Sequence, residues 1–412
     1  MTSAQKKTFV ASFLGWTLDA FDYFLVIVVV SHLATDFHKT VPQVLIAVTL
    51  TLAMRPLGAL IFGWIGDRYG RRLPLMIDIA LFSVIELLTA FSPNFTVFLV
   101  LRAAFGLAMG GEWGLGSALA MEALPPNRRG LFSGLLQEGY AVGSLLAGLS
   151  LTFLFPLIGW RGMFVVGALP AFLIFFIRAH VPESAVWLAG KHERLALQAD
   201  ILWSAVKRSW PLFIYGILLM AAFNFMSHGS QDVYPTFLKN QLAFPVAAAG
   251  WIVTIYSCGM ILGGTFFGWI SQRLGRRNSI VIAAIVGLFA IPMWAFSHTF
   301  AMVALGSFWL QFAVQGAWGI IPAHLNEISP NLARGTFPGL VYQLGNLISA
   351  GAPAFLATLA AGRFALASGA PDYAKAMAIF IAVVFVAVIT MTLLGRAVAP
   401  ENRNADFSPT MS

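Results

Sequence analysis

The 412-residue sequence contains few charged residues and almost no cysteine. Only 10% of its residues are charged, whereas 59% are hydrophobic, and a soluble domain is about one quarter charged. So few polar groups could not cover the surface of a soluble chain of this length, and we expect a protein of the lipid bilayer. The single cysteine, Cys258, excludes an intrachain disulfide, and its apolar neighbourhood predicts a packing role.

Long hydrophobic runs make up most of the chain. The basic N-terminus, MTSAQKKTFV, leads into one of them without a small-residue cleavage site, so we interpret it as the start of a membrane helix and not as a signal peptide. A membrane helix needs roughly 20 mostly apolar residues. Twelve segments qualify: 9–34, 43–66, 73–92, 95–120, 131–157, 160–180, 211–238, 247–271, 278–297, 300–325, 336–361 and 373–398.

The longest polar interval divides these segments into two sets of six. We therefore predict an all-α membrane protein with twelve transmembrane helices in two six-helix repeats. Its expected parts are an N-terminal bundle (1–180), a cytoplasmic central loop (181–210), a C-terminal bundle (211–398) and a cytoplasmic tail (399–412).

The two halves are similar at a constant offset of 205 residues. Gly63-Trp64-Ile65 recurs as Gly268-Trp269-Ile270, and Trp113-Gly114 recurs as Trp318-Gly319. Glu122 and Gly130 match Glu327 and Gly335 at the same offset. Six helices per repeat preserve the orientation of the second half, so the repeats are parallel and related by an axis along the membrane normal.

Lysine and arginine are distributed unevenly over the predicted loops. Eighteen of the 25 fall on the side of the N-terminus and five on the other, while Arg55 and Arg102 lie within spans. Because positive loops stay inside, we expect both termini in the cytoplasm and the chain in the inner membrane. The net charge of +8 then reflects orientation, and we expect no nucleic-acid partner.

GWIGDRYGRR, residues 63–72, ends the second predicted helix and matches the G-x-x-x-D-R-x-G-R-R signature of the major facilitator superfamily. With the twelve spans and the repeat, the chain resembles this superfamily over its whole length. The second copy, GWISQRLGRR, carries Gln272 where the first carries Asp67. The resemblance implies a cytoplasmic gate that an ion pair holds in one conformation, formed by Gly63, Asp67, Arg68, Gly70, Arg71 and Arg72. Alternatively, the arginines only set the topology.

The seventh predicted helix contains a polar stretch, NFMSHGSQDVYPT, in an otherwise apolar run. Its pattern Asn224-x-x-Ser227-His228-x-Ser230-Gln231-Asp232-x-x-x-Thr236 resembles the helix 7 signature of the fungal lactate/pyruvate permease family, which is grouped with the sialate/proton symporters. GWTLDAFDYF, RAAFGLAMGGEWG and VYQLGN are similar to the same branch. The resemblance implies a proton-coupled symporter of short monocarboxylates, with the acid anion and protons as its partners and without a cofactor.

The position of this stretch supports a site within the membrane. Asn224 should lie roughly 20 Å into the bilayer, past the middle of its ~30 Å core, and His228 about one turn further. Asn224, Ser227, His228 and Gln231 must face protein or water, as substrate-binding groups or as interhelical hydrogen-bond partners. His228 and Asp232 can titrate and are candidates for proton coupling. Gly229 and Pro235 predict a bent or unwound outer half.

Two aspartates of the first helix correspond to this stretch through the repeat. The offset places Asn224 on Asp19 and Ser227 on Asp22, so we expect the two segments to face each other across the pseudo-twofold axis. Two carboxylates one turn apart in a dry site favour the binding of a proton. Alternatively, one of them pairs statically with an arginine.

A carboxylate substrate needs a cation, which Arg102 or Arg55 could provide. Arg102 is favoured because its position resembles the helix 4 arginine of the superfamily, whereas Arg55 could simply neutralise an aspartate. Glu112 of the same helix 4 motif is a further proton candidate, unless it pairs with groups of helix 2 or 11.

Helices 5 and 11 supply the remaining candidates. Gln343 and Asn346 could donate hydrogen bonds to the substrate, and Tyr140 lies near the repeat position of Gln343. Glu138 occupies that repeat position itself, where we would expect a neutral amide, and is a candidate for proton coupling. Glu122 should pair with basic loop residues such as Arg128 and Arg129. We expect His324 and Glu327 to be gate or interface groups.

Two other functions are compatible with these sequence features. A proton symporter of sialic acid or an aromatic acid would share these features, and a non-transporting membrane sensor is a further alternative. We find no metal cluster, nucleophile motif or phosphate loop, so we expect neither an enzyme nor a metal site. We expect a monomer.

Overall fold

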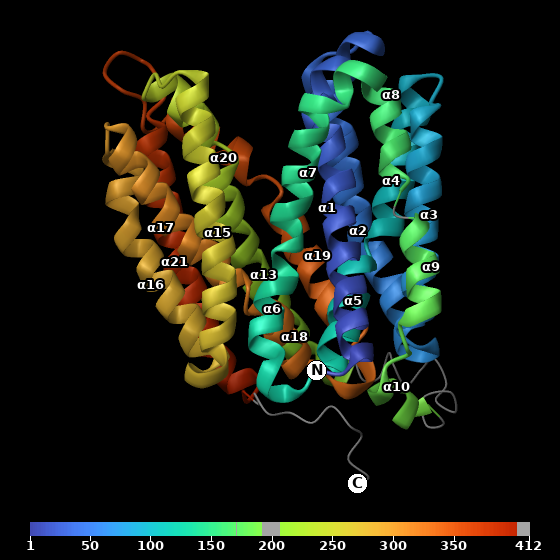
Figure 1. Cartoon of the computed structure of the whole chain (residues 1–412). Coiled ribbons are helices and arrows are strands. Elements are labelled where there is room, and N and C mark those ends of the chain that lie inside the picture. Colours follow the sequence, from blue (N-terminus) through green and yellow to red (C-terminus); the bar gives the residue numbers. More distant parts are fainter. Residues whose placement is uncertain (170, 192–206, 402–412) are drawn as a thin grey trace.

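The computed structural model describes residues 1–169, 171–191 and 207–401. All regular elements in these ranges are helices, and they form two bundles that lie side by side (Figure 1). Residues 192–206 of the predicted central loop and 402–412 of the predicted tail lie outside the described residues. Helix α1 begins and α21 ends on the same side of the molecule, the lower side in Figure 1, which we call the terminal side.

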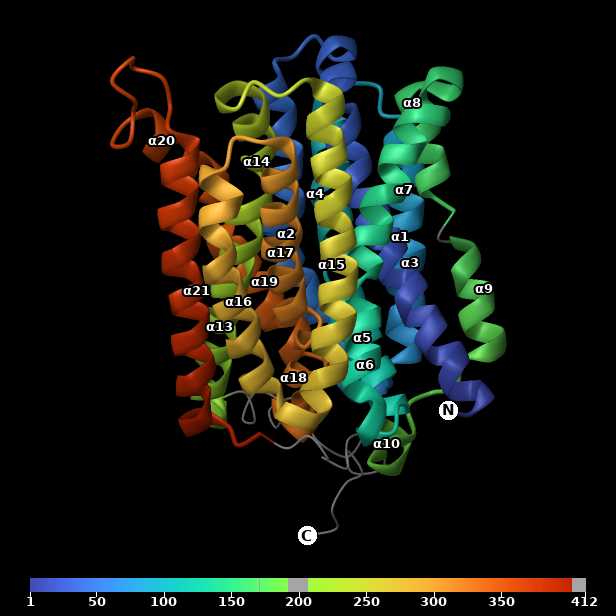
Figure 2. The same cartoon turned by 60° about the vertical axis from the view of Figure 1, so that its left-hand side comes forward.

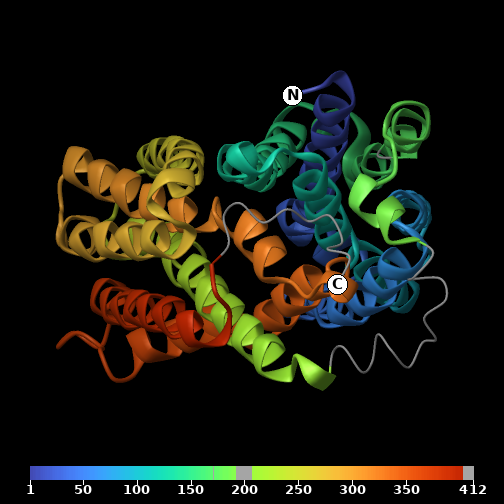
Figure 3. The same cartoon turned by 90° about the horizontal axis from the view of Figure 1, so that it is seen from below.

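The first group of helices, which we call the N bundle, contains α1 (Ser3–Asp36), α2 (Val41–Tyr69), α3 (Arg72–Ala90), α4 (Phe95–Met109), α5 (Glu112–Ala123), η1 (Pro126–Arg128), α6 (Arg129–Gln137), α7 (Gly139–Phe153), α8 (Phe155–Gly167), α9 (Ala171–His180) and α10 (Ala185–Ala189). The C bundle contains α13 (Trp210–Gln231), α14 (Tyr234–Thr236), η2 (Phe237–Gln241), α15 (Val246–Leu274), α16 (Arg276–Phe296), α17 (Phe300–Trp318), α18 (Ile321–Ile328), η3 (Asn331–Ala333), α19 (Phe337–Ser349), α20 (Ala352–Ala361) and α21 (Tyr373–Val398). The view along the helices from below shows the two bundles as neighbouring groups (Figure 3).

The membrane spans agree with the prediction of an all-α membrane protein. Eleven segments of the described chain are long and apolar enough to cross a bilayer. The remaining predicted span, 131–157, corresponds to α6 and α7, which are interrupted at Glu138.

Helix 7 is broken, as its sequence predicts, but at a different residue. Helix α13 ends at Gln231, and α14 begins at Tyr234 with Pro235 in its first turn, where proline is tolerated. Gly229 remains helical. A Cβ atom there would lie 2.5 Å from Cε1 of Phe380, so this glycine makes room for a ring of α21.

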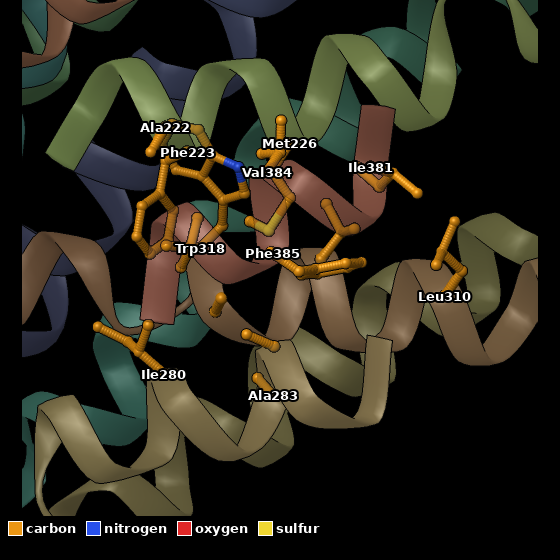
Figure 4. Close-up of a cluster of buried hydrophobic side chains, with 14 of the residues drawn as sticks. Ala222, Phe223, Met226, Ile280, Ala283, Leu310, Trp318, Ile381, Val384 and Phe385 are labelled. Atoms are coloured by element: carbon orange, nitrogen blue, oxygen red, sulfur yellow. The ribbon is translucent and has the colours of Figure 1, made fainter. Parts of the chain in front are cut away.

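The C bundle has a packed apolar core. Phe223 and Met226 of α13 point towards Trp318 of α17 and Phe385 of α21 (Figure 4). In a bilayer such contacts hold helices together through close packing, because lipid tails are as apolar as the side chains. Cys258 does not belong to this core: it is exposed on α15, so its predicted packing role was wrong.

The two bundles touch through glycine-rich surfaces near the terminal side. Helix α15 lies beside α6 (Figure 2), and a Cβ atom at Gly268 would lie 2.7 Å from the carbonyl oxygen of Gly130. The repeat-related pair α2 and α19 is equally close, since a Cβ atom at Gly63 would lie 2.6 Å from Cα of Thr336. Backbones can approach this closely only where side chains are absent.

Candidate functional site

The first buried ion pair of the N bundle joins two residues singled out from the sequence. Arg55 of α2 donates to Asp19 of α1 over 3.0 Å, and both are almost fully buried. The guanidinium carbon lies 6.0 Å from the ring centre of Tyr23. Arg55 also acts electrostatically on Tyr342 of α19 and Tyr140 of α7, so this pair lies close to the interface between the bundles.

The second buried ion pair contains Arg102, which lies inside the N bundle and not at the bundle interface. Arg102 of α4 pairs with Glu86 of α3, and its guanidinium carbon lies 4.0 Å from the ring centre of Phe105 and 5.4 Å from that of Phe164. These partners all belong to the N bundle. Arg102 is therefore enclosed in its own bundle, whereas Arg55 has neighbours from the C bundle, and this favours Arg55 over the sequence preference for Arg102 as the substrate's cation.

Asp22 lies next to this second pair. Its Oδ1 atom and Cγ of Glu86 would each be 2.9 Å from a Cβ atom at Gly167 of α8. Neither oxygen of Asp22 has a hydrogen-bond partner in the described part of the chain. Asp22 thus faces the inside of its own bundle, and the expectation that it would face Ser227 across the pseudo-twofold axis was wrong.

Two further carboxyls are buried in the N bundle near Asp19. Glu112, the first residue of α5, packs its carboxyl against Gly15 of α1, and Asp78 lies on α3. Both are fully buried, and neither makes a hydrogen bond to a described residue. The alternative that Glu112 pairs with helix 2 or 11 is therefore not observed. Asp78 and Glu86 were missed from the sequence, although a lone carboxylate within a hydrophobic span is itself a functional signal.

The polar stretch of helix 7 forms contacts within the C bundle. His228 Nδ1 lies 2.8 Å from Asp232 Oδ2, and its Nε2 lies 3.4 Å from Asn346 Oδ1 of α19. Ser227 accepts a 2.7 Å hydrogen bond from the indole of Trp318, and Gln231 donates to Gln311 over 3.1 Å. Asn224 donates to the carbonyl of Met220, on its own helix.

The side chains of this stretch therefore differ in accessibility. His228 and Asp232 are partly exposed, with 23% and 37% of their side-chain surface accessible. Asn224 is buried. A partly exposed, hydrogen-bonded histidine–aspartate pair can exchange protons, whereas Ser227 and Gln231 show the interhelical bonding that the alternative interpretation describes.

An aromatic cluster joins the bundles at the level of these groups. Trp16 of α1 stacks on Tyr140 of α7 with 5.8 Å between ring centres, and Trp113 of α5 lies 4.7 Å from Tyr342 of α19. Trp318 lies 5.7 Å from Tyr342 on the C-bundle side. Of these five residues, only Tyr140 was a candidate site residue in the sequence. The tryptophans were not, since tryptophans in a membrane protein usually contact lipid or pack.

Two predicted residues lie nearby without a hydrogen bond. Gln343 of α19 is buried, and neither its oxygen nor its nitrogen has a partner in the described chain. Glu138, at the break between α6 and α7, packs against Gly264 of α15 and faces Gln315 of α17. Glu138 is therefore a carboxyl enclosed between the two bundles.

The predicted gate motif connects the bundles on the terminal side. Asp67 accepts hydrogen bonds from the amide of Gly335 (2.7 Å) and from the amide and hydroxyl of Thr336 (2.9 and 2.8 Å). Arg71 donates to Asp67 over 2.7 Å and to Glu122 over 3.2 Å. Burial opposes the charge of Arg71, but the carboxylates of Glu122 and Asp67 outweigh it and raise its pKa, so the guanidinium stays charged.

The other members of the motif have different surroundings. Gly70 has φ 105°, which favours glycine, and ends α2. Arg68 lies over the rings of Trp64 and Tyr69, at 5.8 and 5.6 Å. The amide of Arg72 donates to Glu183. Glu122 pairs with Arg71 and, at 4.0 Å, with Arg334, so it does pair with basic residues at the helix ends, as expected, although these two come from other loops than Arg128 and Arg129.

The second copy of the motif, GWISQRLGRR, makes an equivalent contact through the side-chain amide of Gln272. Gln272 accepts from the amide of Gly130 over 3.3 Å, and this contact is the repeat equivalent of Asp67 with Gly335. Arg276 pairs with Glu327 over 2.7 Å, while His324 is fully buried beside it on α18. Gly275 repeats the positive φ of Gly70, at 100°.

Two repeated helical bundles with buried ion pairs in the membrane-spanning region, joined by contacts on one side, have the architecture of a membrane transporter. Family models described as "Major Facilitator Superfamily" and "Sugar (and other) transporter" match residues 12–231 and 203–402. The chain belongs to the major facilitator superfamily.

Named relatives are transporters of several compounds. The "Carboxylic acid transporter protein homolog" of Saccharomyces cerevisiae is 32% identical over 433 residues, covering 96% of this chain and 68% of that protein. The "Sialic acid transporter NanX" of Escherichia coli is 28% identical over 365 residues, covering 88% and 89%. Among solved structures, the proton:xylose symporter XylE matches with a TM-score of 0.76 at 18% identity, covering 98% of each chain, which supports the fold.

Proposed function

We propose that the protein imports short monocarboxylates such as lactate or pyruvate together with a proton. Relatives named as carriers of carboxylic acids, sialic acid and niacin support an organic acid as the substrate. The helix 7 signature supports the smaller acids. We further propose that the terminal side faces the cytoplasm of a cell whose inner membrane holds the protein, because most lysines and arginines lie there.

The buried pair of Arg55 and Asp19 carries this proposal. A guanidinium at mid-membrane can bind a carboxylate with two parallel hydrogen bonds, and its resident carboxylate can release it by taking up a proton. A buried cation without an anion is unfavourable by several kcal/mol. Arg55 therefore needs one anion at all times, either Asp19 or the substrate.

Coupling follows from this exchange of partners. When Asp19 binds a proton, Arg55 is free to bind the acid anion, and the loaded site is neutral overall. When the substrate and the proton have left, Asp19 pairs with Arg55 again, and the empty site is also neutral. States with only the proton or only the anion leave a buried charge without a partner, so they change conformation poorly.

The C bundle would complete the site. We assign His228 and Asn346 to hydrogen bonds with the substrate's polar end, and Asp232 to orienting His228 and exchanging protons with it. Asp67 and its partners would hold the terminal side closed, so that under alternating access the substrate would enter from the opposite side. Rocking of the two bundles around this interface would then expose the site to the cytoplasm.

Uptake of labelled L-lactate into proteoliposomes, with and without an inward proton gradient, tests the proposal. Pyruvate, acetate, benzoate and sialic acid serve as competitors. We expect gradient-stimulated uptake that pyruvate blocks. Asp19→Asn should bind the anion but lose the stimulation, because its side chain cannot carry the proton. His228→Ala and Asp232→Asn should both lower gradient-driven uptake.

The control is Asp36→Asn, because Asp36 is an exposed carboxylate paired with Arg161 at the far end of α1. Its uptake should equal that of the wild type. Gradient-independent uptake by the wild type would contradict proton coupling. Undiminished coupled uptake in Asp19→Asn would remove Asp19 from the mechanism, and the same result in both His228→Ala and Asp232→Asn would remove that pair.

The aromatic cluster favours a second candidate, an importer of a larger planar acid. The rings of Tyr140 and Tyr342 near Arg55, and of Trp16 packed against both, could stack on an aromatic or unsaturated substrate. Relatives named for niacin and cis,cis-muconate support this class. Competition by benzoate but not by pyruvate, without lactate uptake, would favour it.

A further inference from the structure

Five carboxyl groups and two guanidinium groups are buried in the middle of the N bundle: Asp19, Asp22, Asp78, Glu86 and Glu112, with Arg55 and Arg102. The arginines pair with Asp19 and Glu86. Three carboxyls are left without a guanidinium of their own in the described chain. An apolar interior favours the protonated form of such a group, so the bundle can hold protons at sites that the substrate does not touch.

Three of these carboxyls follow one another from the centre of the bundle towards the terminal side. Glu112 packs against Gly15, which lies one turn, or ~6 Å, before Asp19 on α1. Glu112 itself lies ~16 Å above the end of α5 at Ala123, and Asp78 only ~9 Å above the start of α3 at Arg72. The series therefore descends from Asp19 through Glu112 to Asp78.

The three groups also influence one another electrostatically. The charged groups that act on Asp78 are Glu112, Asp19 and Arg55, and those that act on Glu112 are Asp19 and Arg55. All of them lie on α1, α2, α3 and α5 within the N bundle. No described polar group satisfies the oxygens of Glu112 or Asp78, so these carboxyls are free to pass a proton on.

We propose that Asp19, Glu112 and Asp78 form a proton route inside the N bundle, which leads from Arg55 to the terminal side and is separate from the path of the substrate. The inference rests on the proposed proton symport. In each transfer, the O–H bond of one carboxylic acid breaks as a new O–H bond forms on the next carboxylate, or on a water between them, so that charge and atoms balance.

The last part of the route is closed in the described conformation. Leu75 and Phe82, three residues before and four residues after Asp78, flank it on the same face of α3 and belong to an apolar cluster with Ile177 and Val181. This layer keeps the proton from leaking in the described conformation. All of its residues belong to the N bundle, so release of the proton at the terminal side needs a movement of α9 against α3 when the bundles change conformation.

Infrared spectroscopy of the purified full-length protein tests the protonation of this route without any substrate. We expect protonated-carboxyl absorption in the wild type at neutral pH, and a loss of part of it in both Asp78→Asn and Glu112→Gln. Ser83→Ala, a buried residue of α3 whose hydroxyl also lacks a partner, should retain it. Unchanged absorption in both carboxyl variants would overturn the proposal.

Transport of L-lactate separates this inference from the proposed function. In Asp78→Asn, gradient-driven uptake should fall on the order of 100-fold, the lower end of what a positioned proton-transfer group contributes. Exchange of internal for external lactate needs no net proton release and should persist. Asp78→Glu should restore net uptake.

Three outcomes are distinguishable. A wild type without proton-driven uptake refutes the proposed symport itself. A coupled wild type with unimpaired net uptake in Asp78→Asn overturns the proton route alone. Loss of exchange together with uptake in Asp78→Asn also overturns it, because Asp78 would then serve the substrate site or the fold.

Discussion

At the scale of single residues, two arginines of one bundle have different surroundings. Arg55 lies near the bundle interface and pairs with Asp19, whereas Arg102 is enclosed by Glu86, Phe105 and Phe164. Both were candidates for the substrate's cation. Only Arg55 combines a carboxylate partner with neighbours from the opposite bundle, and for this reason the proposed coupling depends on Arg55.

Removal of the enclosed arginine should destabilise the protein. Arg102→Gln leaves Glu86 buried without a counter-charge, which costs about 3–5 kcal/mol. The double variant Glu86→Gln/Arg102→Gln removes both charges and should recover most of that stability. The melting temperature of the detergent-purified protein measures the effect.

Glu86→Gln alone is the control, since it leaves the arginine unpaired instead. A double variant as unstable as Arg102→Gln would show that Arg102 stabilises the bundle through its ring contacts and not through the ion pair.

At the scale of elements, glycines decide where the bundles touch. Gly268 of α15 meets the backbone of Gly130 and Gly134 on α6, whereas Gly250 on the same helix has open space around it. The interruption between α6 and α7 lies at the same interface, because it falls at Glu138, whose carboxyl packs against Gly264 of α15. Small residues and breaks thus position the surfaces that open and close.

Gly268→Ala should weaken closure of the terminal side. The added methyl group would lie 2.9 Å from Cα of Gly134, and overpacking of this kind costs about 1–3 kcal/mol. We expect about a tenfold rise in the labelling rate of a cysteine placed at Ser133, a buried interface residue, since ~1.4 kcal/mol is a tenfold change in an equilibrium. The label is a maleimide reagent, which reacts with thiols. The exposed natural cysteine is removed by Cys258→Ser, so that only the introduced cysteine reacts.

Gly250→Ala is the matched control on α15 and should leave the labelling rate unchanged. Equal rates in Gly268→Ala and Gly250→Ala would mean that the glycine contact does not limit closure.

At the scale of the whole molecule, the two repeats close the terminal side with related but unequal contacts. Asp67 binds three donors of the C bundle, whereas Gln272 accepts one amide of the N bundle. Hydrogen bonds to a charged group contribute about 1.5–3 kcal/mol and neutral ones about 0.5–1.5 kcal/mol. The latch of the first repeat should therefore dominate.

Asp67→Asn should open the terminal side more than Gln272→Ala does. The side-chain NH₂ group of the asparagine would face the backbone N–H donors of Gly335 and Thr336. Gln272→Ala removes only the neutral hydrogen bond with Gly130. Labelling of the cysteine at position 133 in vesicles of known orientation measures both the opening and the side from which the reagent arrives. Labelling from the outside of the cell would contradict the proposed orientation, and equal rates in the two variants would contradict the dominance of Asp67.

The sequence pointed to many residues of the candidate site but not to their pairings. It singled out Asp19, Arg55, His228 and Asp232 because ionisable groups within apolar spans stand out. It missed Asp78 and Glu86, which lie on a helix without a recognised motif. It also favoured Arg102 over Arg55, since nothing local distinguishes an enclosed arginine from one at an interface.

The sequence by itself determined the membrane spans, the repeat, the superfamily and the position of the motif GWIGDRYGRR, for which we propose a gate role. These follow from the length of apolar runs and from residue spacing, which are local properties of the chain. Only the tertiary structure decided that Asp19 pairs with Arg55, that Glu86 holds Arg102 and that Asp67 reaches Gly335. These partners lie on different helices, and the pairing depends on how the helices pack, because a buried charge binds the counter-charge that packing brings within reach.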